Sequence, residues 1–217
     1  MRALVSWSSG KDSAWALHSL REEGVEVVGL VTTVNQETDR VSMQGVRRSL
    51  LTLQAGALGL PVWEVALPWP CSNEEYQRRM GELIERAEAA SITHIAFGDL
   101  FLDDVRSYRE EMLAPTSIEP LFPIWCGEQG TVELARRMVA AGTQAHITCV
   151  DPTQLDPSYV GRPWDPTDLP DGVDPLGERG EFHTFCWAGP LFPRPIPVVP
   201  GEVIERDGFY WADLIPG

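Results

Sequence analysis

The sequence lacks the features that mark secreted, membrane-spanning or zinc-binding proteins. No apolar run among its 217 residues approaches the length of a membrane span. The four cysteines form no C-x-x-C pair, so neither a zinc site nor a dithiol redox pair is indicated. Free thiols, buried or partly buried in a reducing cytosol, are the simplest interpretation. The sequence therefore predicts a cytoplasmic protein with no membrane partner. The cysteines are Cys71, Cys126, Cys149 and Cys186.

Positive charge is also scarce. Lys and Arg number 17 against 32 Asp and Glu, which gives a formal net charge of −15 at pH 7. A surface this acidic argues against a nonspecific grip on nucleic acid phosphates or on an anionic membrane. We therefore do not expect nucleic acid as a partner.

The Walker A pattern is absent as well. It requires a Gly five residues before Gly-Lys and a Ser or Thr after the Lys, where this chain has Val5 and Asp12. This spacing argues against an ordinary P-loop NTPase.

What the N-terminus does contain is a strand, a polar loop and a helix in direct succession. The apolar residues 3–5 precede the loop, and residues 14–20 have helical apolar spacing. A helix N-terminus offers free backbone N–H groups to an anion. Lys11 adds a mobile positive charge, and Asp12 could hold a metal ion bound to phosphate. A plain helix cap is the alternative, but a lysine adds little to a cap. The loop is Ser8, Ser9, Gly10, Lys11, Asp12 and Ser13.

The remainder of the first 150 residues alternates between strands and helices. This alternation predicts an α/β fold with a doubly wound, mostly parallel five-stranded sheet in residues 1–150. The segment 119–125 is apolar and broken by proline, as expected near a sheet edge. The expected strands after the first are 26–34, 62–67, 93–99 and 144–150, and the expected helices after the first are 42–58, 73–90, 101–112 and 128–141.

Two further places could carry chemistry. Gly98 and Asp99 end a predicted strand, and the carboxyl ends of parallel strands face the ligand crevice; a simple turn is the alternative. Residues 151–180 are rich in Asp, Pro and Gly and read as a long irregular loop. It leads into Glu178 and Glu181, two acids separated by a short glycine turn, for which a polar hairpin entry is the alternative.

Residues 151–217 are expected to form this loop and a small β-rich appendage packed on the first domain. Two short strands between residues 195 and 214 flank Asp207-Gly208, which is a hairpin signal.

The loop resembles the pyrophosphate-binding loop Ser-Gly-Gly-x-Asp-Ser of the N-type ATP pyrophosphatases, with Ser9 in place of the first Gly. Together with the late motif Gly-Glu-x-Gly-Glu-aromatic at residues 177–182, it resembles the diphthine-ammonia ligase family of the adenine nucleotide alpha-hydrolase-like (HUP) superfamily. The resemblance covers nearly the whole chain. Weaker matches between the two motifs lie at Met43, at Gly98-Asp99 with Asp103 and Arg106, and at 120–125.

The resemblance implies an ATP-dependent amidation. ATP activates a carboxylate as an acyl-adenylate with release of pyrophosphate, and ammonia then displaces AMP. The implied cofactors are ATP and Mg²⁺, and the implied partners are ammonia and a small-molecule or protein-borne carboxylate acceptor. The sequence shows no glutaminase signature, so free ammonia is the expected nitrogen source, and the chain could form a homodimer.

The resemblance also assigns roles to residues. The loop from Ser8 to Ser13 would cradle pyrophosphate, with the metal at Asp12. Val31 and Thr32 would lie near adenine, and Gly98 and Asp99 near ribose or the α-phosphate. Glu178 and Glu181 would face the acyl substrate or steer ammonia. The implied catalytic set is Lys11, Asp12, Asp99, Glu178 and Glu181, and the implied substrate-side set is Met43, Arg106, Gly180 and His183.

One departure from the family pattern is His183, which stands where family members typically carry an acid. This favours a short, bacterial-type member whose acceptor differs from diphthine. His183 would then be a base or a substrate contact; a hydrogen-bonded core histidine is the alternative.

Two other functions share this loop. A tRNA-modifying enzyme would use the same adenylation on a base, but the acidic charge and the missing Cys pair oppose it. A non-catalytic adenine-nucleotide sensor would need affinity without a departing pyrophosphate, so the second acidic motif opposes that alternative.

Overall fold

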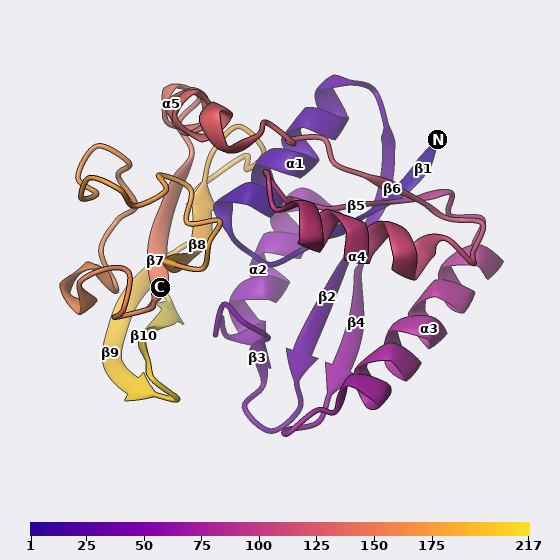
Figure 1. The fold of residues 1–217 in the computed structure, drawn as a ribbon, viewed down its shortest axis with the longest axis horizontal. Coiled ribbons are helices and arrows are strands. Elements are labelled where there is room, and N and C mark those ends of the chain that lie inside the picture. The colour runs from indigo at the N-terminus through magenta and orange to yellow at the C-terminus, as the bar shows by residue number, and fades with distance from the viewer.

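The computed structural model describes residues 1–217 as an α/β sheet domain with a second, antiparallel sheet beside it (Figure 1). In the first sheet, β2 has β4 on one side and β1 on the other, and β1 continues through β5 to β6. These five strands are all parallel, as predicted. Their bounds are β1 Arg2–Ser6, β2 Glu26–Asn35, β4 Val62–Leu67, β5 His94–Ala96 and β6 Glu119–Leu121. A short sixth strand, β3 (Arg40–Val41), pairs antiparallel with the end of β2.

Helices cover both faces of this sheet, because its central strands bury side chains on both sides. Val5 and Leu30 pack into a core with α1 and α2. Their neighbours Leu4 and Val31 point the opposite way, into a core with α3 and the end of α4. The sheet is therefore doubly wound. The helices are α1 Lys11–Glu22, α2 Arg48–Leu58, α3 Asn73–Ala89, α4 Asp103–Leu113 and α5 Thr131–Ala140, the last preceded by a 3-10 turn at Glu128–Gly130.

The second sheet has the strand order β8-β7-β10-β9 and is antiparallel throughout. The predicted hairpin is confirmed, with positive φ at Asp207 (54°) and Gly208 (81°), as an Asp-Gly turn requires. The strands are β7 Gln144–Val150, β8 Phe182–Ala188, β9 Val198–Arg206 and β10 Phe209–Pro216. The predicted irregular loop at 151–180 contains only a 3-10 turn, at Pro157–Tyr159.

Two sequence predictions about elements are wrong. The strand at 144–150 exists, but it pairs with β8 and β10 rather than entering the parallel sheet; the fifth parallel strand is β6. The helix expected over 42–58 begins only at Arg48. The division of the chain into 1–150 and 151–217 stays a prediction.

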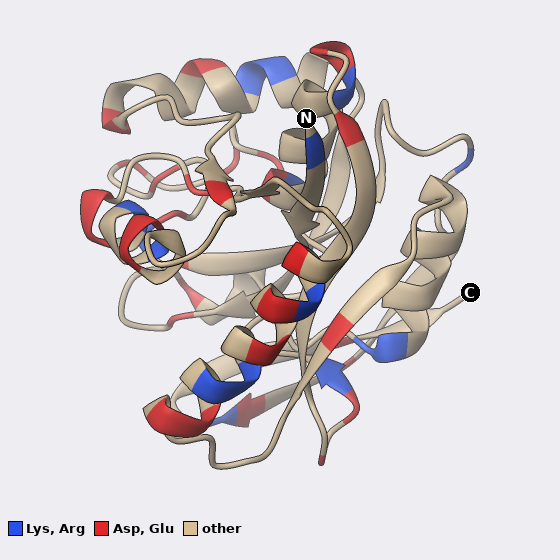
Figure 2. Ribbon diagram, turned by 90° about the vertical axis from the view of Figure 1, so that its right-hand side faces the viewer, with Lys and Arg blue, Asp and Glu red and all other residues tan.

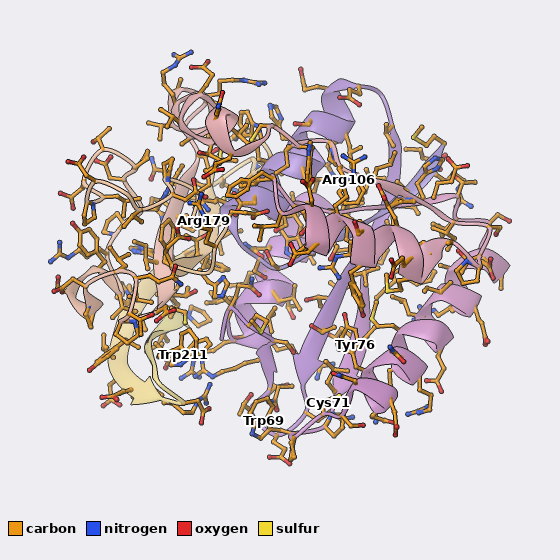
Figure 3. The ribbon with its side chains drawn as sticks, viewed as in Figure 1. Trp69, Cys71, Tyr76, Arg106, Arg179 and Trp211 are labelled. Atoms are coloured by element: carbon orange, nitrogen blue, oxygen red, sulfur yellow. The ribbon has the colours of Figure 1, made fainter.

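A contact with the distant strand β10 explains the shortened helix. Met43 and Gly45 have φ values of 67° and 64°, which no α-helix allows. A Cβ on Gly45 would lie 2.7 Å from the Trp211 ring (Figure 3). Arg40 and Arg47 both bind the Asp213 carboxylate, each at 2.8 Å from Oδ1. Hydrogen bonds from the two guanidinium groups hold the pKa of Asp213 below its usual range.

Positively and negatively charged residues are intermixed along the outer helices, as the blue and red segments of the ribbon in Figure 2 show. On α3, Arg79 pairs with Glu75 at 2.6 Å, and on α4, Arg106 pairs with Glu110 at 2.8 Å. Such neighbouring pairs leave much of the scarce positive charge engaged at the surface. None of the helices has both the length and the apolar composition that a membrane crossing requires.

Gln54 on α2 joins the parallel sheet, the polar loop and the second sheet. Its side chain is fully buried, and Nε2 donates to the backbone oxygens of Ser9 (3.0 Å) and Cys186 (2.7 Å). Its Oε1 accepts a hydrogen bond from Trp7 Nε1 at 2.9 Å. All three partners lose that hydrogen bond if the amide is removed.

We therefore expect Gln54→Leu to lower the free energy of unfolding by about 3 kcal/mol. The buried Trp7 N–H loses its partner, which costs roughly 1–3 kcal/mol, and two backbone carbonyls each lose a hydrogen bond. Urea unfolding followed by circular dichroism measures the loss. Gln77→Leu, at an exposed position of α3, is the matched control and should change stability by less than about 0.5 kcal/mol. Equal effects of the two substitutions would contradict this role.

Candidate active site

The loop after β1 has a left-handed backbone conformation at Ser9, the position where the similar pyrophosphate-binding loop has its first glycine. Ser9 has a φ of 70° and is fully buried, and its carbonyl accepts a hydrogen bond from Cys186 N at 2.9 Å. Serine is strained in this left-handed region, whereas glycine is not. The Ser9 hydroxyl is buried with no hydrogen-bond partner. Ser9 thus shapes the loop through its backbone.

The loop lies directly against β8. The Lys11 backbone N–H donates to Thr184 Oγ1 at 3.2 Å. A Cβ on Gly10 would lie 3.1 Å from the Thr184 carbonyl oxygen and 3.2 Å from its hydroxyl. Gly10 is therefore required for this close approach. Residues that are more than 170 positions apart in the chain meet here.

The Lys11 side chain is buried, so the prediction of a mobile charge is wrong. Only 1% of it is exposed, and its ammonium group donates to the Leu176 carbonyl and to Asp12 Oδ2, the latter at 2.9 Å. The Nζ atom also lies 5.3 Å from the Phe182 ring centroid and 5.5 Å from that of Trp164. The lysine therefore joins the N-terminal loop to the late motif.

The late motif is a tight loop held by its own carboxylates. Gly177 has a φ of 72°, and a Cβ there would lie 2.8 Å from the Phe182 carbonyl oxygen. Glu181, 3% exposed, accepts backbone hydrogen bonds from Asp174 (3.1 Å) and Arg179 (2.9 Å). Asp174 in turn accepts from Glu178 N at 2.9 Å. Glu181 thus fixes the shape of the loop that presents Glu178.

Both motifs line one cavity of about 230 Å³ at the carboxyl ends of β1 and β5. This is the crevice that the fold predicts for a ligand. Its wall comes from the N-terminal loop, the segment after β5, α4, the late motif and β8. The residues of the wall are Ser6, Ser8, Gly10, Lys11, Asp12, Ser13, Gln44, Phe97, Gly98, Asp99, Arg109, Leu176, Gly177, Glu178, Phe182, His183 and Thr184.

Gly98 lines this cavity and lies close to the start of α1. A Cβ there would lie 3.1 Å from both the Asp12 carbonyl carbon and the Ser13 nitrogen. The segment after β5 therefore packs directly on the first turn of α1, and Asp99 follows at the cavity wall.

Several predicted residues lie outside the cavity wall. Val31 and Thr32 are buried in β2, where the Thr32 hydroxyl has no hydrogen-bond partner. Met43 is 69% exposed in the turn before α2. Gly180 occupies the turn of the late motif with a φ of 84°. Ser9 and Glu181 shape the two motifs from behind the wall.

Arg106 is also outside the wall. Its guanidinium lies 4.8 Å from the Phe122 ring centroid and 4.9 Å from that of Trp125, at the surface of α4 (Figure 3). Sequence reasoning missed Arg109, three residues later on the same helix, which does line the cavity. It also missed Gln44 beside Met43, and Thr184 beside His183. Each missed residue lies within three positions of a residue that was named.

Three carboxylates lie at the cavity wall, and the charges of Asp12 and Asp99 both disfavour ionisation of Glu178. Burial raises the pKa of Asp12 and of Asp99, while Lys11 and Arg109 respectively lower them. Burial also raises the pKa of Glu178 to about 7, a hydrogen bond from Leu100 N opposes the rise, and the charges of Asp12 and Asp99 add to it. A carboxyl group that titrates near neutral pH can exchange a proton during catalysis.

His183 is a neutral imidazole at the cavity wall. Burial, and secondarily the Lys11 charge, lower its pKa to about 4. A neutral imidazole can accept a proton or a hydrogen bond at physiological pH.

The cavity fits a phosphate-bound Mg²⁺ better than a metal ion held by protein alone. The structure contains no group of three His, Cys, Asp or Glu side chains that could hold a metal ion. Asp12 Oδ1, however, is buried without a hydrogen-bond partner. Mg²⁺ is commonly held by one or two carboxylates together with substrate phosphates, which matches this donor set.

The strain at Ser9 generates a stability prediction. Ser9→Gly should give a higher free energy of unfolding than Ser9→Ala by about 1 kcal/mol, because only glycine adopts this φ without penalty. The comparison cancels the loss of the hydroxyl, since both variants lack it. At the exposed Ser158, where φ is not positive, Gly should be no better than Ala. Urea unfolding of the four variants measures these differences in unfolding free energy. If Ser9→Ala is as stable as Ser9→Gly, the backbone at this position is not strained.

The raised pKa of Glu178 generates a pH prediction. This carboxyl group titrates at about 7 in the folded chain against 4.5 in its unperturbed state. The folded chain therefore holds the proton more tightly, and the resulting stability is complete below pH 4.5 and is lost as the pH rises through 7. Between these values, the wild type should lose unfolding free energy relative to Glu178→Gln.

Urea unfolding at intervals from pH 4.5 to pH 8 measures that difference. Glu111→Gln, on the exposed part of α4, controls for the amide substitution itself. A difference between wild type and Glu178→Gln that stays constant over the range would show that Glu178 titrates normally.

Comparison with known proteins identifies the family of the chain. Residues 1–115 match the family model of the diphthamide synthase N-terminal domain. Diphthine–ammonia ligases from Bos taurus and Homo sapiens are each 26% identical over 99% of this chain and 89% of their own length. The zebrafish (Danio rerio) diphthine–ammonia ligase is 25% identical over 94% of this chain.

A solved structure described as a predicted subunit of tRNA methyltransferase, from Methanocaldococcus jannaschii, aligns with 90% of this chain and all of its own. The TM-score is 0.46 and the sequence identity 16%.

The family match spans more than half of the chain and includes the polar loop, β1 to β5 and α4 up to the cavity-lining Arg109. It agrees with the resemblance that the two motifs indicate. The chain belongs to the diphthamide synthase N-terminal domain family.

Proposed function

We propose that the protein is an ATP-dependent carbon–nitrogen ligase that adenylates a carboxylate and transfers ammonia to it. This proposal rests on one observation: the N-terminal loop and the late motif line the same cavity. The diphthine–ammonia ligases similar to this chain have names that state ligation to ammonia. The acceptor is a carboxylate that need not be diphthine.

The first step breaks the bond between the α- and β-phosphates of ATP. A carboxylate oxygen of the acceptor attacks the α-phosphorus, and pyrophosphate leaves with the electron pair. The charge to be stabilised is therefore that of pyrophosphate. Ser8, Asp12 and Ser13 line the cavity. The first-turn N–H groups of Asp12 and Ser13 and the hydroxyls of Ser8 and Ser13 would bind pyrophosphate.

Asp12 would hold Mg²⁺ through its unpartnered Oδ1. When bound there, the ion would neutralise charge on the departing phosphates. Lys11 would act from behind, as the fixed charge that keeps the loop and the late motif together.

The second step forms the amide. The nitrogen of ammonia attacks the acyl carbon, the bond from that carbon to the AMP oxygen breaks, and nitrogen loses a proton. Glu178, with its pKa raised to about 7, is suited to accept that proton. The neutral imidazole of His183 lines the same wall and would contact the acceptor. Glu181 would act only by positioning Glu178.

Other expectations from the sequence stay proposals at this point. They are adenine near Val31 and Thr32, ribose or the α-phosphate near Asp99, substrate contacts from Met43, Arg106 and Gly180, a cytoplasmic location, and a homodimer.

The test is a screen of carboxylates with ATP, Mg²⁺ and ammonium chloride, scored for AMP and pyrophosphate. We expect equal amounts of both from the wild type with its acceptor, and at least a 100-fold slower reaction from Asp12→Asn and Lys11→Ala. The first removes the carboxylate that would hold Mg²⁺, and the second removes the charge that joins the loop to the late motif. ADP and inorganic phosphate as products would contradict the proposal. Turnover only with tRNA would favour a tRNA-modifying enzyme, and binding of ATP without products a sensor.

The folding of Asp12→Asn can be checked with a ¹⁵N-lysine label, whereas Lys11→Ala has no lysine and is checked by circular dichroism. Lys11 is the only lysine in the chain. Growth on ¹⁵N-lysine therefore gives a single backbone N–H signal, which reports on the loop itself. In Asp12→Asn this signal should persist and should no longer shift with ATP and Mg²⁺ as it does in the wild type.

A further inference from the structure

Arg109 is a cation at the cavity wall whose hydrogen-bonding capacity is unused. It lies on α4, and its side chain is 23% exposed. Its Nε is 3.5 Å from Asp99 Oδ2, a distance at which the charges attract, but both atoms are buried without a hydrogen-bond partner. A buried N–H group such as Nε, left without an acceptor, is costly.

The surroundings of Arg109 hold its guanidinium in place. Its central carbon lies 4.9 Å from the Phe97 ring centroid and 5.8 Å from that of Tyr108. Aromatic rings stabilise a guanidinium group while leaving its N–H edge free to bind an oxyanion. The side chain is therefore oriented before a ligand arrives.

Lys11, the other cation of the cavity wall, is already engaged. Its ammonium group is bound to the Leu176 carbonyl and to Asp12. An anion in the cavity can therefore meet the N–H groups and hydroxyls of the loop and also the guanidinium group of Arg109.

The position of Arg109 relative to the start of α1 bears on which phosphate it could bind. Gly98 packs on the backbone of Asp12 and Ser13, so Asp99 and its partner Arg109 flank the start of α1. If the loop binds the two departing phosphates, Asp99 and Arg109 at the same cavity wall remain available to the third, the α-phosphate.

We propose that Arg109 binds the α-phosphate of the nucleotide and stabilises the adenylate after pyrophosphate has left. This inference rests on the proposed function, because it assumes ATP in the cavity. Arg109 would bind the phosphate with its N–H edge, while Asp99 keeps the guanidinium aimed across the cavity.

Binding of nucleotides to Arg109→Gln tests the proposal. AMP, adenosine and inorganic pyrophosphate are titrated into the wild type, Arg109→Gln and Arg109→Lys by calorimetry. A charge-assisted contact of this kind contributes about 10- to 100-fold in affinity. We expect Arg109→Gln to weaken AMP by that factor, to leave adenosine and pyrophosphate within about twofold of the wild type, and Arg109→Lys to recover part of the loss.

The matched control is Arg86→Gln. Arg86 also stacks on an aromatic ring, 4.1 Å from the Trp63 centroid, but it lies outside the cavity wall. It should leave all three affinities unchanged. The lone ¹⁵N-lysine signal shows whether each variant keeps the loop intact.

Three results would contradict the proposal, and each has a different meaning. If Arg109→Gln binds AMP as the wild type does, the α-phosphate assignment is wrong, and a role toward the acceptor carboxylate would take its place. If Arg109→Gln weakens adenosine as much as AMP, the residue acts on the shape of the site and not on the phosphate. If the wild type itself binds neither AMP nor pyrophosphate, both this inference and the proposed function fail.

Discussion

The structure depends on the contact between the N-terminal loop and the strand that follows the late motif. Thr184 binds the backbone of Lys11, Cys186 binds that of Ser9, and the Lys11 ammonium reaches the Leu176 carbonyl. Neither segment encloses a cavity by itself. The parallel sheet delivers the loop, the antiparallel sheet delivers β8, and the site exists where they meet. The only lysine of the chain is used at this junction.

This arrangement explains why the cavity combines buried carboxylates with so few free cations. Lys11 neutralises Asp12 from within the protein, and Arg109 faces Asp99 without a hydrogen bond. The remaining acid, Glu178, is presented by a loop whose shape Glu181 fixes. Burial then raises the pKa of Glu178 toward neutrality. One part of the wall is thus suited to bind phosphate and another to exchange a proton, which is what adenylation followed by amide formation requires.

Much of the fold could be predicted from local pattern, because apolar periodicity and turn residues act over short distances. The strand at 62–67, the helix from Asn73 and the Asp-Gly hairpin follow that rule. The failures come from distant contacts. Trp211 and Asp213 on β10 hold residues 40–47 out of a helix. The strand β7 pairs with β8 and β10, which lie 30 or more residues further along the chain, so its local sequence does not show which sheet it joins. For the site, the two motifs indicated the segments that form the cavity, but no local signal showed that Lys11 is buried or that Arg109 rather than Arg106 lines the cavity.

The central claim is that the oxygen of a carboxylate attacks the α-phosphorus of ATP in this cavity. Its most direct test uses a carboxylate that supports AMP formation, labelled with ¹⁸O in the carboxyl group, with the product AMP analysed by mass spectrometry. The account predicts one ¹⁸O atom in the phosphate of each AMP and one in the amide. AMP that carries oxygen only from solvent water would show hydrolysis of ATP without adenylation, and would contradict the account.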